Sequence, residues 1–232
     1  MIDFHSHVLP NVDDGSRSEQ ESIELLRMLK DQSVDTVFMT PHFDAARHTP
    51  ETFFEKCREA LARLRGALPS DERLPELRVG AEVMYYYGIE HLDLLSEFKL
   101  EGTDLLLLEM PVTAWSEHTV KELIHLSCRG DLTLVLAHIE RYSALQNPSV
   151  LRRLLDAGIR MQVNADFFLC LSTRRRALRM LRNGQVHFLG SDCHSMTGRP
   201  PRIGGAVEVI RRKLGDGFLA RLEKFSRSML NA

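Results

Sequence analysis

Seven short apolar segments alternate with longer amphipathic segments, and this alternation constrains the fold more than any other feature of the sequence. The apolar segments are residues 2–4, 35–40, 77–83, 104–109, 132–137, 159–163 and 186–190. Their length and continuous apolar character are typical of parallel strands that are covered on both faces. Strands that alternate with helices form βαβ units. The sequence therefore predicts an α/β fold built on a parallel sheet.

The expected helices have recognisable ends. Residues 16–19 (Ser-Arg-Ser-Glu) match a capping box, and Thr49-Pro50 puts a proline at the first helical position. Further helices are predicted over residues 116–128, 149–157 and 174–182, and two more over 203–230, joined at 215–217. The arginines at 174–176 predict a solvated helix face. Because no low-complexity linker interrupts the pattern, we expect one domain over residues 1–232.

Polar residues follow nearly every predicted strand. They are His5, His7, His42, Glu82, Glu109, His138, Asn164, Asp192 and His194. In a closed parallel barrel the carboxyl ends of the strands meet at one face, where barrel enzymes hold their catalytic groups. An open doubly wound sheet is the alternative, but it would distribute these residues along an edge. We therefore predict a distorted (β/α)7 TIM-like barrel, which is irregular because seven strands replace the usual eight.

The chain opens with two histidines one residue apart, followed by the carboxylate pair Asp13-Asp14. In an extended segment, residues i and i+2 point the same way, so His5 and His7 can reach one ion. An isolated H-x-H more often contains a core histidine and a solvated one. The recurrence of similar residues at later strand ends favours a metal site. The candidate ligands are His5, His7, Asp14, His42, Glu82, Glu109, His138, Asp192 and His194.

This ligand set is too large for one ion, because a catalytic zinc takes three protein ligands. Two or three ions are expected. Imidazole and carboxylate ligands without thiolate favour manganese, iron or zinc over a soft metal, without choosing among them. Clustered ions generate hydroxide near neutral pH and clamp a phosphoryl group, as in multi-metal phosphoesterases. The sequence therefore points to phosphoester hydrolysis.

Two arginines follow predicted ligand strands, Arg141 after His138 and Arg199 after His194. A guanidinium is a rigid fork that matches phosphate oxygens, so each is a candidate phosphate clamp. With 30 basic residues in the chain, a single arginine would usually be a surface charge. We take Arg141 and Arg199, together with Asp14, as the candidate catalytic residues.

A cysteine mechanism competes with this interpretation, because Cys193 and Arg199 have the C-x5-R spacing of thiol-dependent phosphatases. That chemistry requires a thiolate cradled by backbone N–H groups. Here Met196 and Thr197 stand in mid-loop, and Pro200 follows the arginine. The loop context therefore disfavours the cysteine mechanism.

Composition excludes several other classes. The net charge of −2 argues against a general nucleic-acid binder, which needs a basic face. No apolar run approaches a membrane span, and Met1 leads directly into a strand without a signal peptide. The four cysteines are far apart and suit a reducing compartment. We expect a cytoplasmic protein without membrane insertion.

The combined motifs resemble a known family. They are DFHSHxLPxVDDGS from Asp3, TPH, GAE, EMP, AHIERY, QVNA and SDxHxxxGRPP, and they extend to Pro201. The chain is similar to the PHP (polymerase and histidinol phosphatase) superfamily, and within it to the bacterial tyrosine-protein phosphatases that regulate capsule and exopolysaccharide synthesis.

The resemblance implies a distorted barrel with a trinuclear centre, usually of manganese, although iron, zinc or magnesium can replace it. It places the metal ligands on the nine residues above and the phosphate-binding arginine on Arg141; Arg199 is a weaker correspondence. The implied partner is the tyrosine-phosphorylated tail of a polysaccharide-copolymerase kinase.

Two other functions use the same motifs. A small-molecule phosphoesterase of the histidinol-phosphatase type would bind the same metals, and a non-catalytic PHP module would tolerate lost ligands at the strand ends. Selectivity for phosphotyrosine is expected from residues 43–49 with Arg47, 84–88 with three tyrosines, and 111–116 with Trp115. Their aromatic side chains would either hold a phenyl ring or pack into the top of the barrel.

Overall fold

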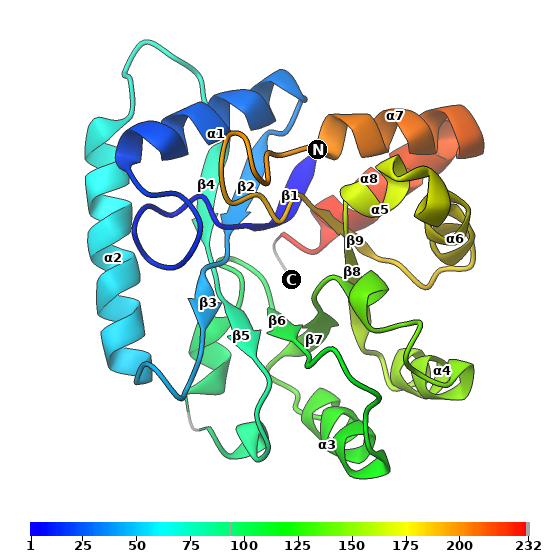
Figure 1. The fold of residues 1–232 in the computed structure, drawn as a ribbon. Coiled ribbons are helices and arrows are strands. Elements are labelled where there is room, and N and C mark those ends of the chain that lie inside the picture. The colour runs from blue at the N-terminus through cyan, green and yellow to red at the C-terminus, as the bar shows by residue number, and fades with distance from the viewer. Residues whose placement is uncertain (93, 231–232) are drawn as a thin grey trace.

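The computed structural model describes residues 1–92 and 94–230 (Figure 1). Every strand pairing among them is parallel, in the orders β1-β2-β4 and β3-β5-β6-β7-β8-β9. The strands are β1 (Ile2–Ser6), β2 (Thr36–Met39), β3 (His42–Phe43), β4 (Glu76–Val79), β5 (Glu82–Met84), β6 (Leu105–Glu109), β7 (Thr133–Leu136), β8 (Arg160–Asn164) and β9 (Phe188–Gly190). The predicted α/β class with a parallel sheet is confirmed.

The two sheets continue into each other and curl (Figure 1). Backbone bonds from Gly80 N to Met39 O and from Glu82 N to Pro41 O, both 3.0 Å, bridge the breaks between β2 and β3 and between β4 and β5. At the other edge, Asp192 N donates to His5 O at 2.8 Å. The strand predicted at residues 77–83 is divided into β4 and β5 at Gly80. Leu100 packs against Gly80 so closely that a Cβ on Gly80 would lie 2.4 Å from the Leu100 side chain.

Helices surround the curled sheet (Figure 1). The main ones are α1 (Glu19–Asp31), α2 (Pro50–Ala67), α3 (Glu117–Ser127), α4 (Pro148–Asp156), α6 (Leu171–Arg182), α7 (Ile203–Leu214) and α8 (Asp216–Ser228). The short elements are α5 (Asp166–Leu169), which was not predicted, and the 3-10 turns η1 (Ile89–His91), η2 (Leu95–Phe98) and η3 (Ile139–Arg141). None of the helices in the described part of the chain is long and apolar enough to cross a membrane.

Helix ends follow the predicted capping chemistry, with one correction. Thr49 caps α2 and Pro50 is its first residue, as predicted. The capping box of α1 lies two residues later than predicted: Ser18 Oγ accepts from Glu21 N at 3.1 Å, and Glu21 accepts from Arg17 N at 2.9 Å. Ser16 cannot serve as the cap because it is buried and its hydroxyl bonds Ser22 at 2.8 Å.

The apolar core has two parts, a large layer between the sheet and the helices and a smaller cluster that includes Ile2, Phe4, Phe38 and Phe188. The ring centroid of Phe4 lies 5.4 Å from the ring centroid of Phe38 and 4.5 Å from the ring centroid of Phe188. The pairing register of β1 with β2 shifts between Asp3 and Ser6. Such a bulge re-aims side chains. It allows β1 to contribute Phe4 to the apolar cluster and the next residue, His5, to the polar site.

Candidate metal centre

The structure brings all nine predicted ligands together at the carboxyl ends of the strands. Their nitrogen and oxygen atoms form four overlapping groups, each within 4.8 Å: His7, Asp14, His42 and His194; His5, Glu82 and His138; His5, His7 and Asp192; and His42, Glu82 and Glu109. Four of these nine residues, His5, His7, His42 and Glu82, belong to two groups each. A cluster with shared members is suited to more than one ion.

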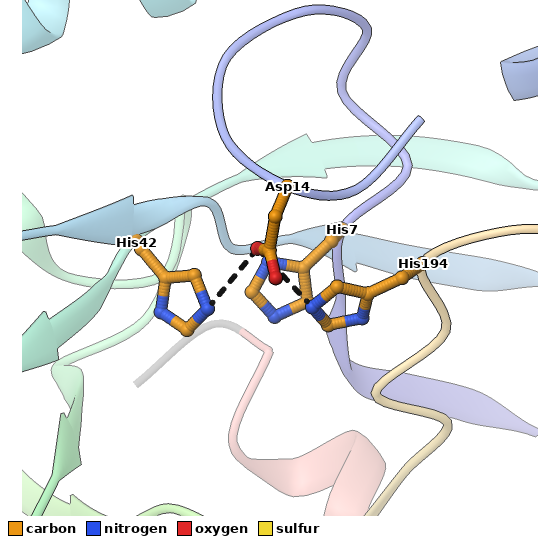
Figure 2. A group of neighbouring side chains, drawn as sticks. All are labelled: His7, Asp14, His42 and His194. Atoms are coloured by element: carbon orange, nitrogen blue, oxygen red, sulfur yellow. Dashed lines mark ion pairs between the residues drawn. The ribbon is translucent and has the colours of Figure 1, made fainter. Parts of the chain in front are cut away.

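The loop between β1 and α1 carries Asp14 over three imidazoles (Figure 2). Asp14 Oδ1 lies 3.5 Å from His42 Nε2 and 3.5 Å from His194 Nε2. The loop folds back on itself, since Ser16 N donates to His7 O at 3.0 Å. Gly15 is required at this contact because a Cβ there would lie 2.2 Å from His7 O. The tight loop thus positions the Asp14 carboxylate.

Glu82 occupies the middle of the cluster and is fully buried. Its Oε1 lies 2.6 Å from His138 Nε2, and its Oε2 lies 3.1 Å from His5 Nε2 and 3.0 Å from His42 Nδ1. Neither Glu82 Oε2 nor His42 Nδ1 makes a hydrogen bond of suitable geometry within residues 1–92 and 94–230. A buried carboxylate oxygen without a donor is unfavourable unless a cation compensates it. The donor set therefore fits metal ions.

Four of the histidines are oriented by a partner at Nδ1 that is not one of the clustered ligand atoms. His7 Nδ1 lies 2.6 Å from Asp13 Oδ2, and His138 Nδ1 lies 2.7 Å from the Tyr142 hydroxyl. His194 Nδ1 lies 3.0 Å from the carbonyl of Asp192, and His5 Nδ1 lies 3.2 Å from Gln162 Oε1. An acceptor at Nδ1 holds the proton there and leaves the Nε2 lone pair facing the cluster, as metal-binding histidines require.

Sequence reasoning missed these orienting residues. Asp13 was noted only as the neighbour of Asp14, and nothing in the pattern tells which of two adjacent carboxylates faces the cluster. Tyr142 and Gln162 lie within the AHIERY and QVNA motifs, but nothing in these motifs tells that either residue contacts a histidine. Asn164, expected only as a polar strand end, donates to Asp192 Oδ2 at 2.7 Å.

Two of the nine residues have left-handed backbone conformations, His138 with φ of 28° and Asp192 with φ of 51°. Such conformations are strained for residues other than glycine and concentrate at functional sites. Hydrogen bonds hold both: His138 N donates to Gln162 Oε1 at 2.7 Å, and Asp192 N donates to His5 O at 2.8 Å. The surrounding structure thus forces both side chains into the cluster.

The charges of the cluster are strongly coupled. Burial opposes protonation of His7, but the hydrogen bond to Asp13 and the nearby carboxylates of Asp192 and Glu82 raise its pKa well above the ordinary value. Burial also opposes ionisation of Glu82, yet the nearby His5 and the hydrogen bond to His138 keep its pKa well below the ordinary range. Because ions must displace protons from such histidines, metal affinity falls as the pH falls.

Both predicted arginines reach the cluster. Arg141 Nη2 and Arg199 Nη2 each lie 2.6 Å from Asp192 Oδ2, and Arg141 Nη1 lies 3.5 Å from Glu109 Oε1. They line a cleft of about 510 Å³ together with Asp14, His42, Arg47 and Met84. A cleft with guanidinium groups beside a ligand cluster suits a phosphate.

The aromatic residues expected at the mouth do not line this cleft. Tyr85 bonds Glu122 on α3, and Trp115 is buried with its Nε1 donating to Pro111 O at 3.1 Å. Tyr87 is exposed against His118, with 5.1 Å between the ring centroids. Of the segments highlighted for selectivity, Asp44, Arg47, His48 and Met84 border the cleft. Tyr85 is instead held by α3, and the Trp115 ring packs against Tyr142, with 5.5 Å between the ring centroids.

Cys193 is unsuitable as a nucleophile. It is fully buried, and burial raises the pKa of its thiol to about 12. The thiol is therefore protonated at neutral pH and is not part of the cleft lining. This agrees with the sequence argument against the cysteine mechanism.

Comparison with known proteins identifies the family. The family model for capsular polysaccharide synthesis, CpsB/CapC, matches residues 1–228. The chain belongs to the CpsB/CapC family. It is 34% identical over 232 residues to the tyrosine-protein phosphatase CpsB of Streptococcus pneumoniae, covering 93% of this chain and 91% of that protein. It is 30% identical to the putative tyrosine-protein phosphatase CapC of Staphylococcus aureus, covering 86% of this chain and 79% of the relative.

A solved structure supports the same assignment. It superposes with a TM-score of 0.84 at 26% identity, covering 100% of this chain and 95% of the other. That structure comes from work on YwqE of Bacillus subtilis and CpsB of Streptococcus pneumoniae, which are described as metal-dependent tyrosine phosphatases. The predicted family and the predicted class of enzyme are confirmed.

Exchange of Asp13 for asparagine tests the outer hydrogen bonds of this CpsB/CapC member. An amide is a weaker acceptor for the His7 Nδ1 proton, so we expect Asp13→Asn to weaken manganese binding about 10- to 100-fold. Calorimetric titration of metal-stripped protein measures the effect. Asp44→Asn is the matched control, because Asp44 lines the same cleft but pairs with Arg47. Equal affinities for the two variants would contradict the orienting role of Asp13.

Proposed function

We propose that the protein is a metal-dependent protein-tyrosine phosphatase whose three ions, most suitably manganese, are held by the nine clustered residues. The observation that carries the proposal is the convergence of nine nitrogen and oxygen ligands next to a cleft that is lined by Arg47, Arg141 and Arg199. The donor set also suits iron, zinc or magnesium. When bound, the ions supply Lewis acidity, which lowers the pKa of water and stabilises charge on a phosphoryl group.

The residues of the chain itself bind and orient the substrate. Arg141 and Arg199 receive the phosphate oxygens, and Asp192 holds both guanidinium groups in place through 2.6 Å contacts. Such preorganised donors stabilise charge that develops in the transition state. The Asp14 side chain, 68% exposed, both faces the histidines and lines the cleft. We assign its free carboxylate oxygen the role of accepting a hydrogen bond from the attacking water.

The proposed substrate is a phosphotyrosine on the tail of a bacterial kinase of polysaccharide synthesis, and the proposed location is the cytoplasm. The family description, capsular polysaccharide synthesis, and the relatives' names as tyrosine-protein phosphatases support the proposed substrate. We further propose that residues 1–232 act as one phosphatase domain. Counting β2 with β3 and β4 with β5 as single strands makes the fold a distorted (β/α)7 barrel.

The substrate proposal is tested by comparing kcat/KM for matched peptides that carry phosphotyrosine, phosphoserine or phosphothreonine. We expect phosphotyrosine to be favoured about tenfold or more, because its longer side chain lets the phosphate reach the arginines while the peptide backbone stays at the rim. Manganese-loaded enzyme is used throughout.

A small-molecule phosphoesterase is the second candidate, because no phenylalanine, tyrosine or tryptophan of the described residues lines the cleft to hold a phenyl ring. Histidinol phosphate therefore belongs in the same comparison. A preference for it over all three peptides, or equal rates for the peptides, would assign the protein to the small-molecule class.

A further inference from the structure

Helix α6 carries an unusual concentration of positive charge. Its twelve residues, Leu171 to Arg182, contain arginines at 174, 175, 176, 179 and 182 and no acidic residue, in a chain whose net charge is −2. None of the five arginines has a carboxylate within 4.0 Å among the described residues. Elsewhere exposed arginines such as Arg63 and Arg211 have carboxylate partners at 3.0 and 2.8 Å. No carboxylate of the described residues therefore neutralises the charge of α6.

The first turn of α6 is attached to the mouth of the site. Arg174 donates to the carbonyls of Phe168 and Leu169 at 2.9 and 2.8 Å, which ties α6 to the segment that follows β8. Arg176 donates to the Ser143 hydroxyl, and Ser143 lies two residues after Arg141. The positive helix therefore starts beside the arginine that we assign to the phosphate.

The other three arginines form one exposed row. Arg175, Arg179 and Arg182 are all exposed, and their spacing of i, i+4 and i+7 puts them on one face of the helix. At a rise of about 1.5 Å per residue, the row is roughly 10 Å long. We call these three residues the arginine row.

We propose that the arginine row binds an acidic stretch of the same polypeptide that carries the phosphotyrosine. This inference rests on the proposed function and adds a feature of the substrate. An extended chain rises about 3.3 Å per residue, so acidic residues three positions apart match the length of the row. Further phosphotyrosines would match as well, because each carries a charge of about −1.5 to −2.

A narrow row on one helix fits a polypeptide better than a membrane surface. A membrane-binding face combines several basic residues with a broad apolar surface. On α6 the exposed large apolar residue is Leu171, at the end of the helix near the mouth. A single exposed ion pair contributes little to the free energy of binding. Several such pairs together accelerate association at low salt and orient the bound polypeptide.

The experiment compares two phosphotyrosine peptides that differ in their flanks, one with five glutamates beside the phosphotyrosine and one with glutamines instead. The readout is the ratio of their kcat/KM values on manganese-loaded enzyme at low salt. We expect the triple variant Arg175→Gln, Arg179→Gln, Arg182→Gln to lower this ratio about tenfold. The corresponding triple lysine variant should keep most of the preference, since it keeps the charge.

A matched control removes three exposed arginines elsewhere, Arg58→Gln, Arg65→Gln and Arg212→Gln on α2 and α7. An unchanged ratio in the α6 variant, or an equal loss in the control, would overturn the proposal. If the α6 triple glutamine variant lost binding to phosphatidylserine vesicles but kept the wild-type ratio of kcat/KM values, the proposal would be overturned in favour of a membrane surface. Failure of the proposed function is distinguishable, because the wild-type enzyme would then fail to hydrolyse even the glutamine-flanked peptide.

Discussion

Treatment with a chelator is expected to reduce phosphatase activity to background, and addition of manganese is expected to restore it. The physical reason is that nine residues with nitrogen or oxygen ligand atoms converge beside the cleft, while no cysteine of the described residues lines it. Without ions, the buried Glu82 carboxylate and its histidines only neutralise one another. Turnover of p-nitrophenyl phosphate, measured beside the metal content of the same sample, gives the result.

Replacement of Cys193 separates this mechanism from thiol catalysis. Because the side chain is fully buried and its thiol protonated, we expect Cys193→Ala to keep kcat within about twofold of the wild type at a temperature where both are folded. Cys193→Ser is expected to be active as well, although a buried hydroxyl lowers stability. An enzyme that resists chelation and is inactivated by both replacements would refute the metal mechanism.

Arg141→Ala is expected to reduce kcat about 100- to 1,000-fold while the metal content remains unchanged. Loss of one preorganised donor to developing charge typically has an effect of this size. The contacts of Arg141 to Asp192, at 2.6 Å, and to Glu109, at 3.5 Å, hold its guanidinium at the edge of the cleft. Arg141→Lys is the conservative comparison and should recover part of the rate, because a lysine keeps the charge but not the fork.

Ligand variants provide the contrast. His138→Ala and Glu109→Ala each remove a clustered ligand, so we expect lower metal content by elemental analysis, with activity lost in parallel. Arg141→Ala should differ from both by retaining the ions. Near wild-type turnover in Arg141→Ala, or loss of metal from it, would show that the residue does not act on phosphate as proposed.

Much of the site was predictable because it depends on chain order. Parallel strands separated by helices must have their carboxyl ends at one face, so residues such as His42, Glu109 and His138 were expected to converge without knowledge of any distance. The helix boundaries at Thr49 and Ser116 were predictable for a similar reason, since their side chains cap the next few backbone N–H groups.

The sequence by itself therefore determined the α/β class, the ligand types and the phosphatase family. Only the tertiary structure decided how the ligand residues are oriented and which side chains line the cleft. The bulge in β1 directs Phe4 and His5 into neighbouring clusters, and the tight loop at Gly15 puts Asp13 behind His7 and Asp14 over His42. The Trp115 ring packs against Tyr142 and Tyr85 bonds Glu122, so partners distant in sequence hold both side chains away from the cleft. Such choices depend on contacts between segments far apart in the chain, which local spacing does not encode.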